Sequence, residues 1–435
     1  MPERPLRVTI AADTIPYIEG GLGYFLFNAV SKLAETQPSW QFKVVATSSF
    51  KELAQIQSPN VKLIFFDQSL LQRTMRKVLG RFLPDGYVSA GNYVLSQHMP
   101  TQWLRVEFGN LKALYGSMRD TDVVWLPHYA IADGYRFSSL ENLSLLRSPI
   151  LFTIHDIHPI FFPDDWSLVA LNKFRKGFVP FAQRSECIIT HTQFQKAAIV
   201  EHLGIEPAKV LVTHCPPLID PAVLLKLCDR AEIQALLSRY HISPLFVLYP
   251  GSGSHTHKNH IRLLLAWAEL RKRLGNNCPT LVCTAKGHLW PALKALIDAL
   301  GLQDKVVFTD TVDTDTLVKL YQGCALVVVP TLYEGGGSGP VAEAYLAGKP
   351  VVCSRIPQIE EQLQWYGVRY ITYFDPNSVD SIADAVESAL ARFPELESQT
   401  KEDQKRLLPL VPQMWEEWAG FYAEQIRRIA NSRAS

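Results

Sequence analysis

The sequence predicts an α/β protein built from two doubly wound domains, each a parallel sheet covered by helices. Three observations predict this class. Short apolar runs alternate with helical patterns, as in a parallel sheet with crossover helices. The runs are apolar at nearly every position, which indicates strands buried on both faces. The alternation stops at Cys215-Pro216-Pro217 and starts again at Leu245, which indicates that the 435 residues form two domains.

The expected elements follow in chain order. The first domain, expected over 1–220, opens with a strand at 7–12, a glycine-rich loop and a helix that ends near Glu35. Its other expected strands are 42–46, 61–66, 123–126, 150–154, 187–190 and 210–213. A mostly helical linker leads to the second domain, expected over 240–405. Its expected strands are 245–249, 280–284, 305–309, 325–330 and 350–354.

Charge and cysteine usage exclude several classes of protein. Forty-three Lys and Arg oppose 42 Asp and Glu, and a net charge of +1 argues against a general polyanion binder, so we expect no nucleic-acid partner. Seven scattered cysteines without a CxxC pair fit reduced thiols, not a disulfide framework or a zinc site. No apolar run suits a signal peptide or a membrane span. We therefore expect a cytoplasmic protein.

The segment 71–82 (LQRTMRKVLGRF) fits the alternation less well than its neighbours and carries four basic residues among apolar ones. The basic residues are Arg73, Arg76, Lys77 and Arg81. One interpretation is a basic amphipathic helix, Leu71 to Phe82, that lies on the anionic inner face of a membrane. The other interpretation is a solvated helix on the domain surface. We favour the surface helix, because four charges alone are a weak signal for membrane binding.

Ligands of doubly wound domains bind at the carboxyl ends of strands, so we expect the site in the loops there. Gly20-Gly21-Leu22-Gly23 follows the first strand and is either an anion-binding helix start or a plain tight turn. It lacks a full GxGxxG, which disfavours a nicotinamide dinucleotide. Lys258 ends a Gly/Ser-rich loop just before a helix, where a phosphate would meet a cation and a helix dipole. His255 and His257 share this loop without a nearby carboxylate or cysteine, so a metal site is disfavoured.

The loop between Glu334 and Glu343 is the most informative of these segments. A strand runs into a stretch with four glycines and then into a helix. Bare backbone N–H groups can hold a polar ligand, and two carboxylates can accept hydrogen bonds from the hydroxyls of a sugar and a ribose. We expect Glu343 in the first turn of the helix, a position that a carboxylate favours even without a function.

Histidines end two neighbouring strands of the first domain. His155-Asp156 closes the strand 150–154, and His128 closes 123–126 in the same manner. Structural roles and roles facing a ligand are equally supported here. Asp313-Thr314-Asp315 matches the Asp-x-Asp that some sugar transferases use to hold a metal, but it precedes a helical run, which favours an ordinary helix N-cap.

These segments together resemble the retaining glycosyltransferases of family four. That family has the GT-B fold, two Rossmann-like domains that face a cleft. The resemblance is carried by TIHDIHPIFFP, YPGSGSHTHKNH, PVVCSRIPQIEEQL and FDPNSVDSIADAVESAL. MWEEWAGFYAEQIRRIA is similar to the family's last helix, which implies that 412–432 crosses back to the first domain. The His-Asp and His-Lys-Asn segments look most like members that build bacterial surface polysaccharides, often with mannose.

The resemblance implies a retaining hexosyltransferase that needs no metal and no resident cofactor. The donor would be a nucleotide-diphosphate sugar, GDP-mannose or a UDP-hexose, and the acceptor a hydroxyl of a glycan or lipid-linked molecule. The implied catalytic residues are His155, Lys258 and Glu334, with His128 and Asp156 on the acceptor side. Lys258 would neutralise the diphosphate and Glu343 would accept hydrogen bonds from the ribose. The other implied donor-binding residues are Gly21, Gly253, Glu334, Gly336, Gly337 and Ser338.

Two departures from the family pattern bear on these roles. Eight residues separate Glu334 from Glu343, where the family has seven. The family's arginine before the lysine falls at Gly253, so we hypothesise that His257 or the helix dipole supplies the missing positive charge. Two other functions stay open at this point: a nucleotide-sugar epimerase of the same fold, and a non-catalytic nucleotide-sugar binding protein.

Overall fold

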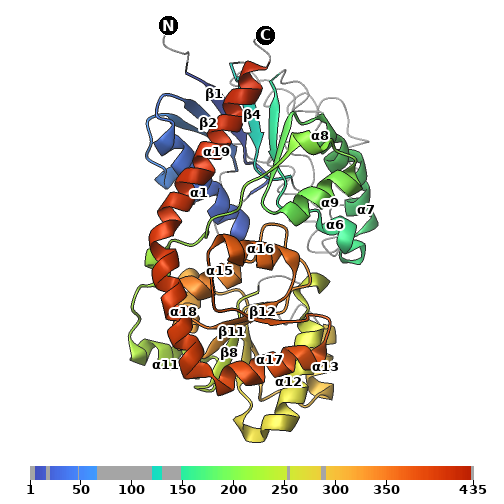
Figure 1. Ribbon diagram of the computed structural model, residues 1–435, viewed down its shortest axis with the longest axis vertical. Coiled ribbons are helices and arrows are strands. Elements are labelled where there is room, and N and C mark those ends of the chain that lie inside the picture. Colours follow the sequence, from blue (N-terminus) through green and yellow to red (C-terminus); the bar gives the residue numbers. More distant parts are fainter. Residues whose placement is uncertain are drawn as a thin grey trace, which may run out of the picture. The chain divides into compact units, whose positions relative to one another are not determined.

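The computed structural model describes residues 5–15, 20–47, 49–65, 120–129, 148–251, 255–285 and 291–432. The chain divides into two compact units (Figure 1). The first comprises Met1–Thr213 and Trp415–Ser435, and the second His214–Met414. Each unit contains one sheet in which all strand pairs are parallel, so the prediction of an α/β protein with two doubly wound sheets is confirmed.

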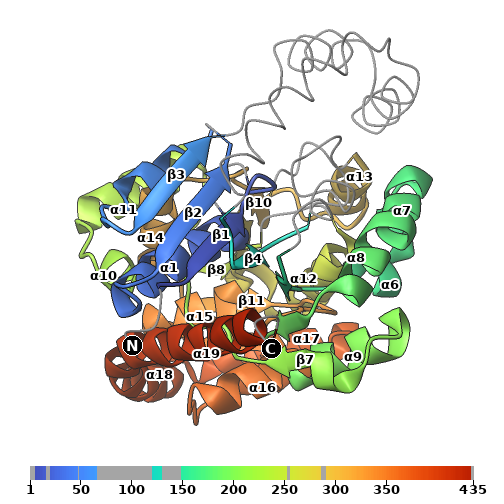
Figure 2. The ribbon, with the colours of Figure 1, turned by 90° about the horizontal axis from the view of Figure 1, so that it is seen from above.

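The first unit contains a seven-stranded sheet of order β3-β2-β1-β4-β5-β6-β7. Its strands are β1 (Arg7–Ala11), β2 (Gln41–Ala46), β3 (Val61–Phe65), β4 (Val123–Leu126), β5 (Ile150–Thr153), β6 (Cys187–Thr190) and β7 (Val210–Val212). The continuous apolar runs β4, β5 and β6 are buried at every residue, as expected for strands covered on both faces. Figure 2 shows β3, β2, β1 and β4 side by side from above.

Helices follow the strands of this unit in the order expected for crossover connections. They are α1 (Gly21–Thr36), α6 (His158–Phe161), α7 (Leu168–Lys173), α8 (Val179–Arg184) and α9 (Gln193–Leu203). Short 3-10 turns occur at Lys51–Gln55, Pro163–Asp165 and Pro207–Lys209, and a π-helical turn at Phe174–Phe178 joins α7 to α8. The core beside this turn is aromatic: Tyr129 packs edge-on against Phe178, and Phe152 against Phe181.

The last helix, α19 (Val411–Asn431), begins in the second unit and continues in the first. Trp418, on this helix, packs edge-on against Phe25 of α1 and stacks on Tyr422 with ring centroids 4.0 Å apart. The Tyr422 hydroxyl lies 2.9 Å from Thr153 Oγ1, which also accepts a hydrogen bond from Trp125 Nε1. The apolar side of α19 is therefore part of the core of the first unit.

The second unit contains a six-stranded sheet of order β10-β9-β8-β11-β12-β13. Its strands are β8 (Phe246–Tyr249), β9 (Thr280–Cys283), β10 (Val306–Phe308), β11 (Leu326–Val329), β12 (Val351–Ser354) and β13 (Thr372–Phe374). The sequence predicted five of them and missed β13. That edge strand has three residues and begins with a threonine, so it lacks the apolar run by which the others were recognised.

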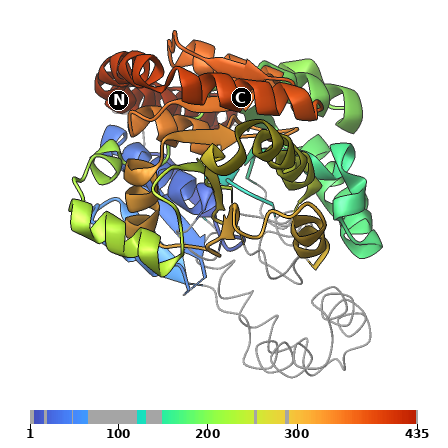
Figure 3. The ribbon, with the colours of Figure 1, turned by 90° about the horizontal axis from the view of Figure 1, so that it is seen from below.

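Helices cover both faces of the second sheet, with α15 and α16 on one side and α12 and α17 on the other (Figure 1). Figure 3 shows the same ribbon from below. The helices are α10 (Pro221–Leu224), α11 (Arg230–Arg239), α12 (His260–Leu274), α13 (Pro291–Ala299), α14 (Thr314–Gly323), α15 (Gly339–Leu346), α16 (Pro357–Trp365), α17 (Val379–Ala391) and α18 (Phe393–Leu407). Short 3-10 turns occur at Thr256–Lys258, Gly275–Asn277 and Leu408–Leu410. Trp267 of α12 is fully buried in the core that these helices share with the strands.

Two predicted features lie outside the described residues: the basic segment 71–82 and Gly253. All seven cysteines lie within the described residues and are free thiols. Among the described helices, none combines the length and hydropathy that crossing a membrane requires.

Candidate functional site

Lys258 and Glu334 meet at the carboxyl edge of the second sheet. Lys258 lies in the loop after β8 and Glu334 in the loop after β11, and these strands are neighbours where the strand order reverses. That reversal is the usual ligand position in doubly wound sheets. Lys258 Nζ lies 2.8 Å from Glu334 Oε1, and both side chains are partly exposed, at 21% and 16%. A cation and a carboxylate are thus paired at a position that a ligand can reach.

Backbone contacts hold the two loops against each other. Asn259 adopts a left-handed conformation (φ 59°), and its side-chain amide donates to the carbonyl oxygens of Pro330 and Pro376. The Leu332 N–H donates to the carbonyl oxygen of His257 at 2.7 Å. Because both loops are tied within two residues of Lys258 and Glu334, the ion pair has a fixed backbone on each side.

The glycine-rich turn before α15 is shaped by a glutamine on α16. Gln362 accepts a hydrogen bond from the Ser338 N–H at 2.8 Å and donates to the Ser338 carbonyl oxygen at 3.1 Å. Gly337 has φ +90°, and a Cβ there would lie 2.7 Å from the Gln362 side chain. The Ser338 N–H is therefore occupied by Gln362. Among the described residues, no hydrogen bond is found from the N–H of Gly336 or Gly337, so these two groups are the donors that the turn offers.

Glu343 lies one turn deeper in α15 than the sequence predicted. The helix begins at Gly339, so Glu343 is its fifth residue, and the first turn contains no carboxylate. Its Oε2 accepts a hydrogen bond of 2.7 Å from the Tyr321 hydroxyl of α14. Burial raises the pKa of Glu343 to about 7, although the Tyr321 hydrogen bond opposes the rise. A carboxyl group with such a pKa can both donate and accept hydrogen bonds near neutral pH.

The histidines of the first unit form a cluster at the ends of β4, β5 and β6. The His155 ring lies 6.3 Å from that of His128, measured between centroids. His155 Nε2 contacts the Pro127 carbonyl oxygen at 2.9 Å, and its Nδ1 contacts Nε2 of His191 at 3.0 Å. Burial, followed by the charges of His191 and His128, lowers the pKa of His155 well below its usual value.

Asp156 and Gly21 have local roles that the sequence left open. Asp156 is exposed, and its Oδ1 accepts a hydrogen bond at 2.9 Å from the N–H of His158, the first residue of α6. Gly21 is the first residue of α1, preceded by Gly20 at φ 99°. Asp313 caps α14 by accepting a hydrogen bond from the Thr316 N–H at 2.8 Å, which confirms the N-cap interpretation of the Asp-x-Asp segment.

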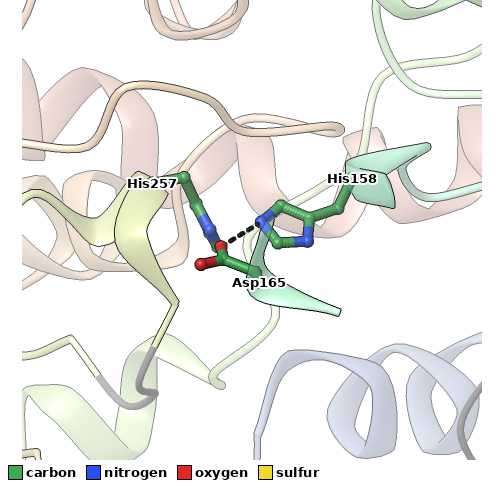
Figure 4. Close-up of side chains that lie close together, drawn as sticks. All are labelled: His158, Asp165 and His257. Carbon is green, nitrogen blue, oxygen red and sulfur yellow. Dashed lines mark ion pairs between the residues drawn. The ribbon is translucent and has the colours of Figure 1, made fainter. Parts of the chain in front are cut away.

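The His158 side chain also contacts Asp165. Figure 4 shows these two side chains pointing toward each other, with His158 Nε2 3.1 Å from Asp165 Oδ2. The Trp166 indole donates a hydrogen bond to His158 Nδ1 at 2.7 Å, and the His158 imidazole stacks on the Phe162 ring. The segment that follows β5 is therefore stabilised by side-chain contacts among residues 156–166.

Sequence reasoning missed Gln362, Tyr321 and His191. Gln362 and Tyr321 lie on helices whose pattern predicts only a buried face, and their partners are 24 and 22 residues away along the chain. His191 sits one residue before the N-cap Thr192 of α9, in a segment without glycines or carboxylates. A polar residue among buried neighbours was the only signal available for any of them.

Comparison with known proteins shows that the second unit is similar to one family of transferases. Residues 242–406 match the family described as glycosyl transferases group 1. The matched stretch contains Lys258, Glu334 and Glu343. An uncharacterized glycosyltransferase of Methanocaldococcus jannaschii is 34% identical over 32% of this chain and 34% of its own length. The O-antigen chain mannosyltransferase RfbU of Salmonella typhimurium is 24% identical over 58% of this chain and 65% of its own length.

The chain thus matches between about a third and two thirds of the length of these relatives. It resembles bacterial polysaccharide mannosyltransferases, as the sequence motifs indicated. Among solved structures, HepE of Anabaena in complex with UDP and glucose superposes with a TM-score of 0.66 at 17% identity, covering 96% of this chain and all of that one. The predicted GT-B fold is therefore confirmed, with the two sheets and their flanking helices as its framework.

Proposed function

We propose that this protein is a glycosyltransferase that moves a hexose from a nucleotide-diphosphate sugar to a hydroxyl of a glycan or lipid-linked acceptor, with retention of the anomeric configuration. The observation that carries the proposal is the Lys258–Glu334 pair at the carboxyl edge of the second sheet, followed in the same loop by the N–H groups of Gly336 and Gly337, which have no hydrogen bond to the part of the chain that the structure describes. The likeness to O-antigen mannosyltransferases supports a mannose or related hexose donor.

In this proposal Lys258 stabilises the departing diphosphate. Sugar transfer passes through an oxocarbenium-like centre while negative charge builds on the leaving phosphate, so a fixed cation lowers the barrier most where that charge develops. The diphosphate takes the place of Glu334 as the partner of Lys258. Glu334 is then free to accept hydrogen bonds from sugar hydroxyls, together with donation from the N–H groups of Gly336 and Gly337.

Glu343 binds the ribose in this proposal. Its Oε2 is held by Tyr321, while Oε1 lies on the side of Gly339, where an added Cβ would be 3.5 Å from it. A carboxyl group fixed at one oxygen presents the other to two neighbouring hydroxyls at little entropic cost. His155, His128 and Asp156 in the first unit are proposed to serve the acceptor side, and Gly21 the donor phosphates.

Retention follows if the leaving phosphate itself helps to deprotonate the acceptor hydroxyl on the same face of the sugar. No separate strong base is then required, and the paired acid and base of glycoside hydrolysis are not needed. Lys258 and the helix N-terminus supply the positive charge that a metal supplies elsewhere, so we propose that transfer proceeds without a divalent ion. Transfer that survives EDTA would support this; loss of transfer with EDTA and its recovery with Mg²⁺ or Mn²⁺ would contradict it.

A thermal-shift panel of GDP- and UDP-sugars identifies the donor, because a ligand that binds the native state stabilises it by mass action. Acceptor-dependent release of the nucleoside diphosphate from that donor then tests transfer. Nucleotide release without any acceptor would favour an epimerase of the same fold, and donor binding with no turnover a binding protein.

Lys258→Ala is the decisive variant for this site. Removing one preorganised group that stabilises transition-state charge costs about 10²- to 10³-fold in turnover, so we expect a loss of that order with the fold intact. Lys272→Ala, which removes an exposed lysine of α12, is the matched control and should transfer at the wild-type rate. Near wild-type turnover by Lys258→Ala would refute the role of this residue.

A further inference from the structure

Two imidazoles, His191 fully buried and His155 half-buried, lie side by side at the carboxyl edge of the first sheet. His155 follows β5 and His191 follows β6, and these strands are neighbours in the sheet. Their ring centroids are 5.0 Å apart, with His191 Nε2 3.0 Å from His155 Nδ1. His191 is 1% exposed. The contact is thus a direct one between two titratable rings with almost no access to water at His191.

The outer nitrogens of the two rings both face carbonyl oxygens. His155 Nε2 lies 2.9 Å from the Pro127 carbonyl oxygen, and His191 Nδ1 lies 3.1 Å from that of Thr213. A carbonyl oxygen only accepts, so each outer nitrogen must carry a proton to make its hydrogen bond. The central contact needs one proton more. All three hydrogen bonds therefore form only when the two rings together hold three protons, one more than two neutral imidazoles have.

The surroundings oppose protonation of the pair, and they oppose a second extra proton more strongly than the first. The Phe25 ring of α1 meets both imidazoles edge to face, at 4.7 Å and 5.6 Å between centroids, and supplies no charge. The titratable groups that act on His155 are His191 and His128, and both oppose its protonation, as burial does. Asp156, next to His155, is exposed and engaged with the His158 N–H. Two cationic rings in contact would repel in this apolar setting, so the second protonation is suppressed.

We propose that His191 is a positioning residue for His155, and that the two rings bind one proton as a single unit. The proposal rests on the proposed function, in which His155 serves the transfer site. His191 fixes the plane of the His155 ring and keeps its Nε2–H directed at Pro127. When it takes up that proton, the pair presents one shared positive charge, and not an independent histidine, at the edge of the sheet where polar ligands bind.

Proton uptake by the pair is read directly from the full chain labelled with ¹⁵N-histidine. We expect the ring nitrogens of His155 and His191 to shift together at one midpoint, with one proton taken up per pair. In His191→Phe this joint step should disappear. The remaining titration midpoint, of His155 alone, should differ from the wild-type midpoint by about one pH unit. His202→Gln, which removes an exposed histidine of α9, should leave the joint step unchanged. Independent midpoints in the wild type, or an unmoved His155 in His191→Phe, would overturn the proposal.

Transfer assays separate positioning from simple support of the fold. We expect His191→Phe to lower kcat/KM and to change its pH midpoint. His191→Gln restores a hydrogen-bonding partner for His155 without a titrating ring, so it should recover much of the rate but not the wild-type pH midpoint. Equal losses in both variants with an unchanged pH profile would show a merely structural role and overturn the proposal. Because the labelling experiment needs no turnover, failure of the transferase proposal is distinguishable from failure of the shared proton.

Discussion

Glu343→Gln should change the stability of the protein in a manner that depends on pH. The pKa of Glu343 rises from its usual 4.5 to about 7 in the native state, because desolvation of the half-buried carboxyl group, which faces Tyr321 of α14, disfavours its charged form. One pKa unit corresponds to roughly 1.4 kcal/mol, so charging this group in the native state costs about 3 kcal/mol at most. Glutamine has the same shape, stays neutral at every pH and can still accept the Tyr321 hydrogen bond.

The sign follows from proton linkage. Between pH 4.5 and 7 the native state retains a proton that the unfolded glutamate has released, so the free energy of unfolding falls as the pH rises through this window. At pH 5 the variant and the wild type should therefore differ little. At pH 8, where the wild type is charged, Glu343→Gln should be the more stable by up to about 3 kcal/mol.

Equilibrium urea unfolding of the full chain at pH 5 and pH 8 measures this difference. Glu416→Gln, which replaces an exposed glutamate of α19, is the matched control. Its free energy of unfolding should differ from that of the wild type by the same amount at pH 5 and at pH 8. If Glu343→Gln shifted stability by the same amount at pH 5 and pH 8, the inference that Glu343 is buried with a raised pKa would be wrong.

Two further substitutions test the turn before α15 and the returning helix. Gly337→Ala should cost about 1–3 kcal/mol, because it combines φ +90° with a Cβ 2.7 Å from the Gln362 side chain. Gly301→Ala, at φ +65° with no atom near its Cβ, should cost less, and equal unfolding midpoints for the two would contradict this reading. Trp418→Ala should cost about 3–5 kcal/mol by leaving a cavity against Phe25 and Tyr422. Denaturant unfolding measures it, and a loss below that of truncating the exposed Leu410 would refute the packing described for α19.

Loop contacts were the hardest part of the site to predict from the sequence. The sequence predicted both Lys258 and Glu334 as site residues, but these two residues are 76 positions apart along the chain. Their 2.8 Å contact forms because β8 and β11 are neighbours in the sheet. The turn at Gly337 was selected for its glycines. The hydrogen bond from the Ser338 N–H to Gln362 depends on the packing of α16, and no local sequence pattern predicts that packing.

Local patterns of apolar residues and glycines were enough to predict the class of fold, nearly all the strands and the loops that contain the site. Buried strands must be continuously apolar, and loops that approach a ligand need glycines, so both leave a local signature. The pairing of polar groups depends on the folded arrangement: Lys258 pairs with Glu334, Glu343 with Tyr321, and His155 with His191. The physical reason is that hydrogen bonds are satisfied across neighbouring strands and helices, and strand order brings together residues that are far apart along the chain.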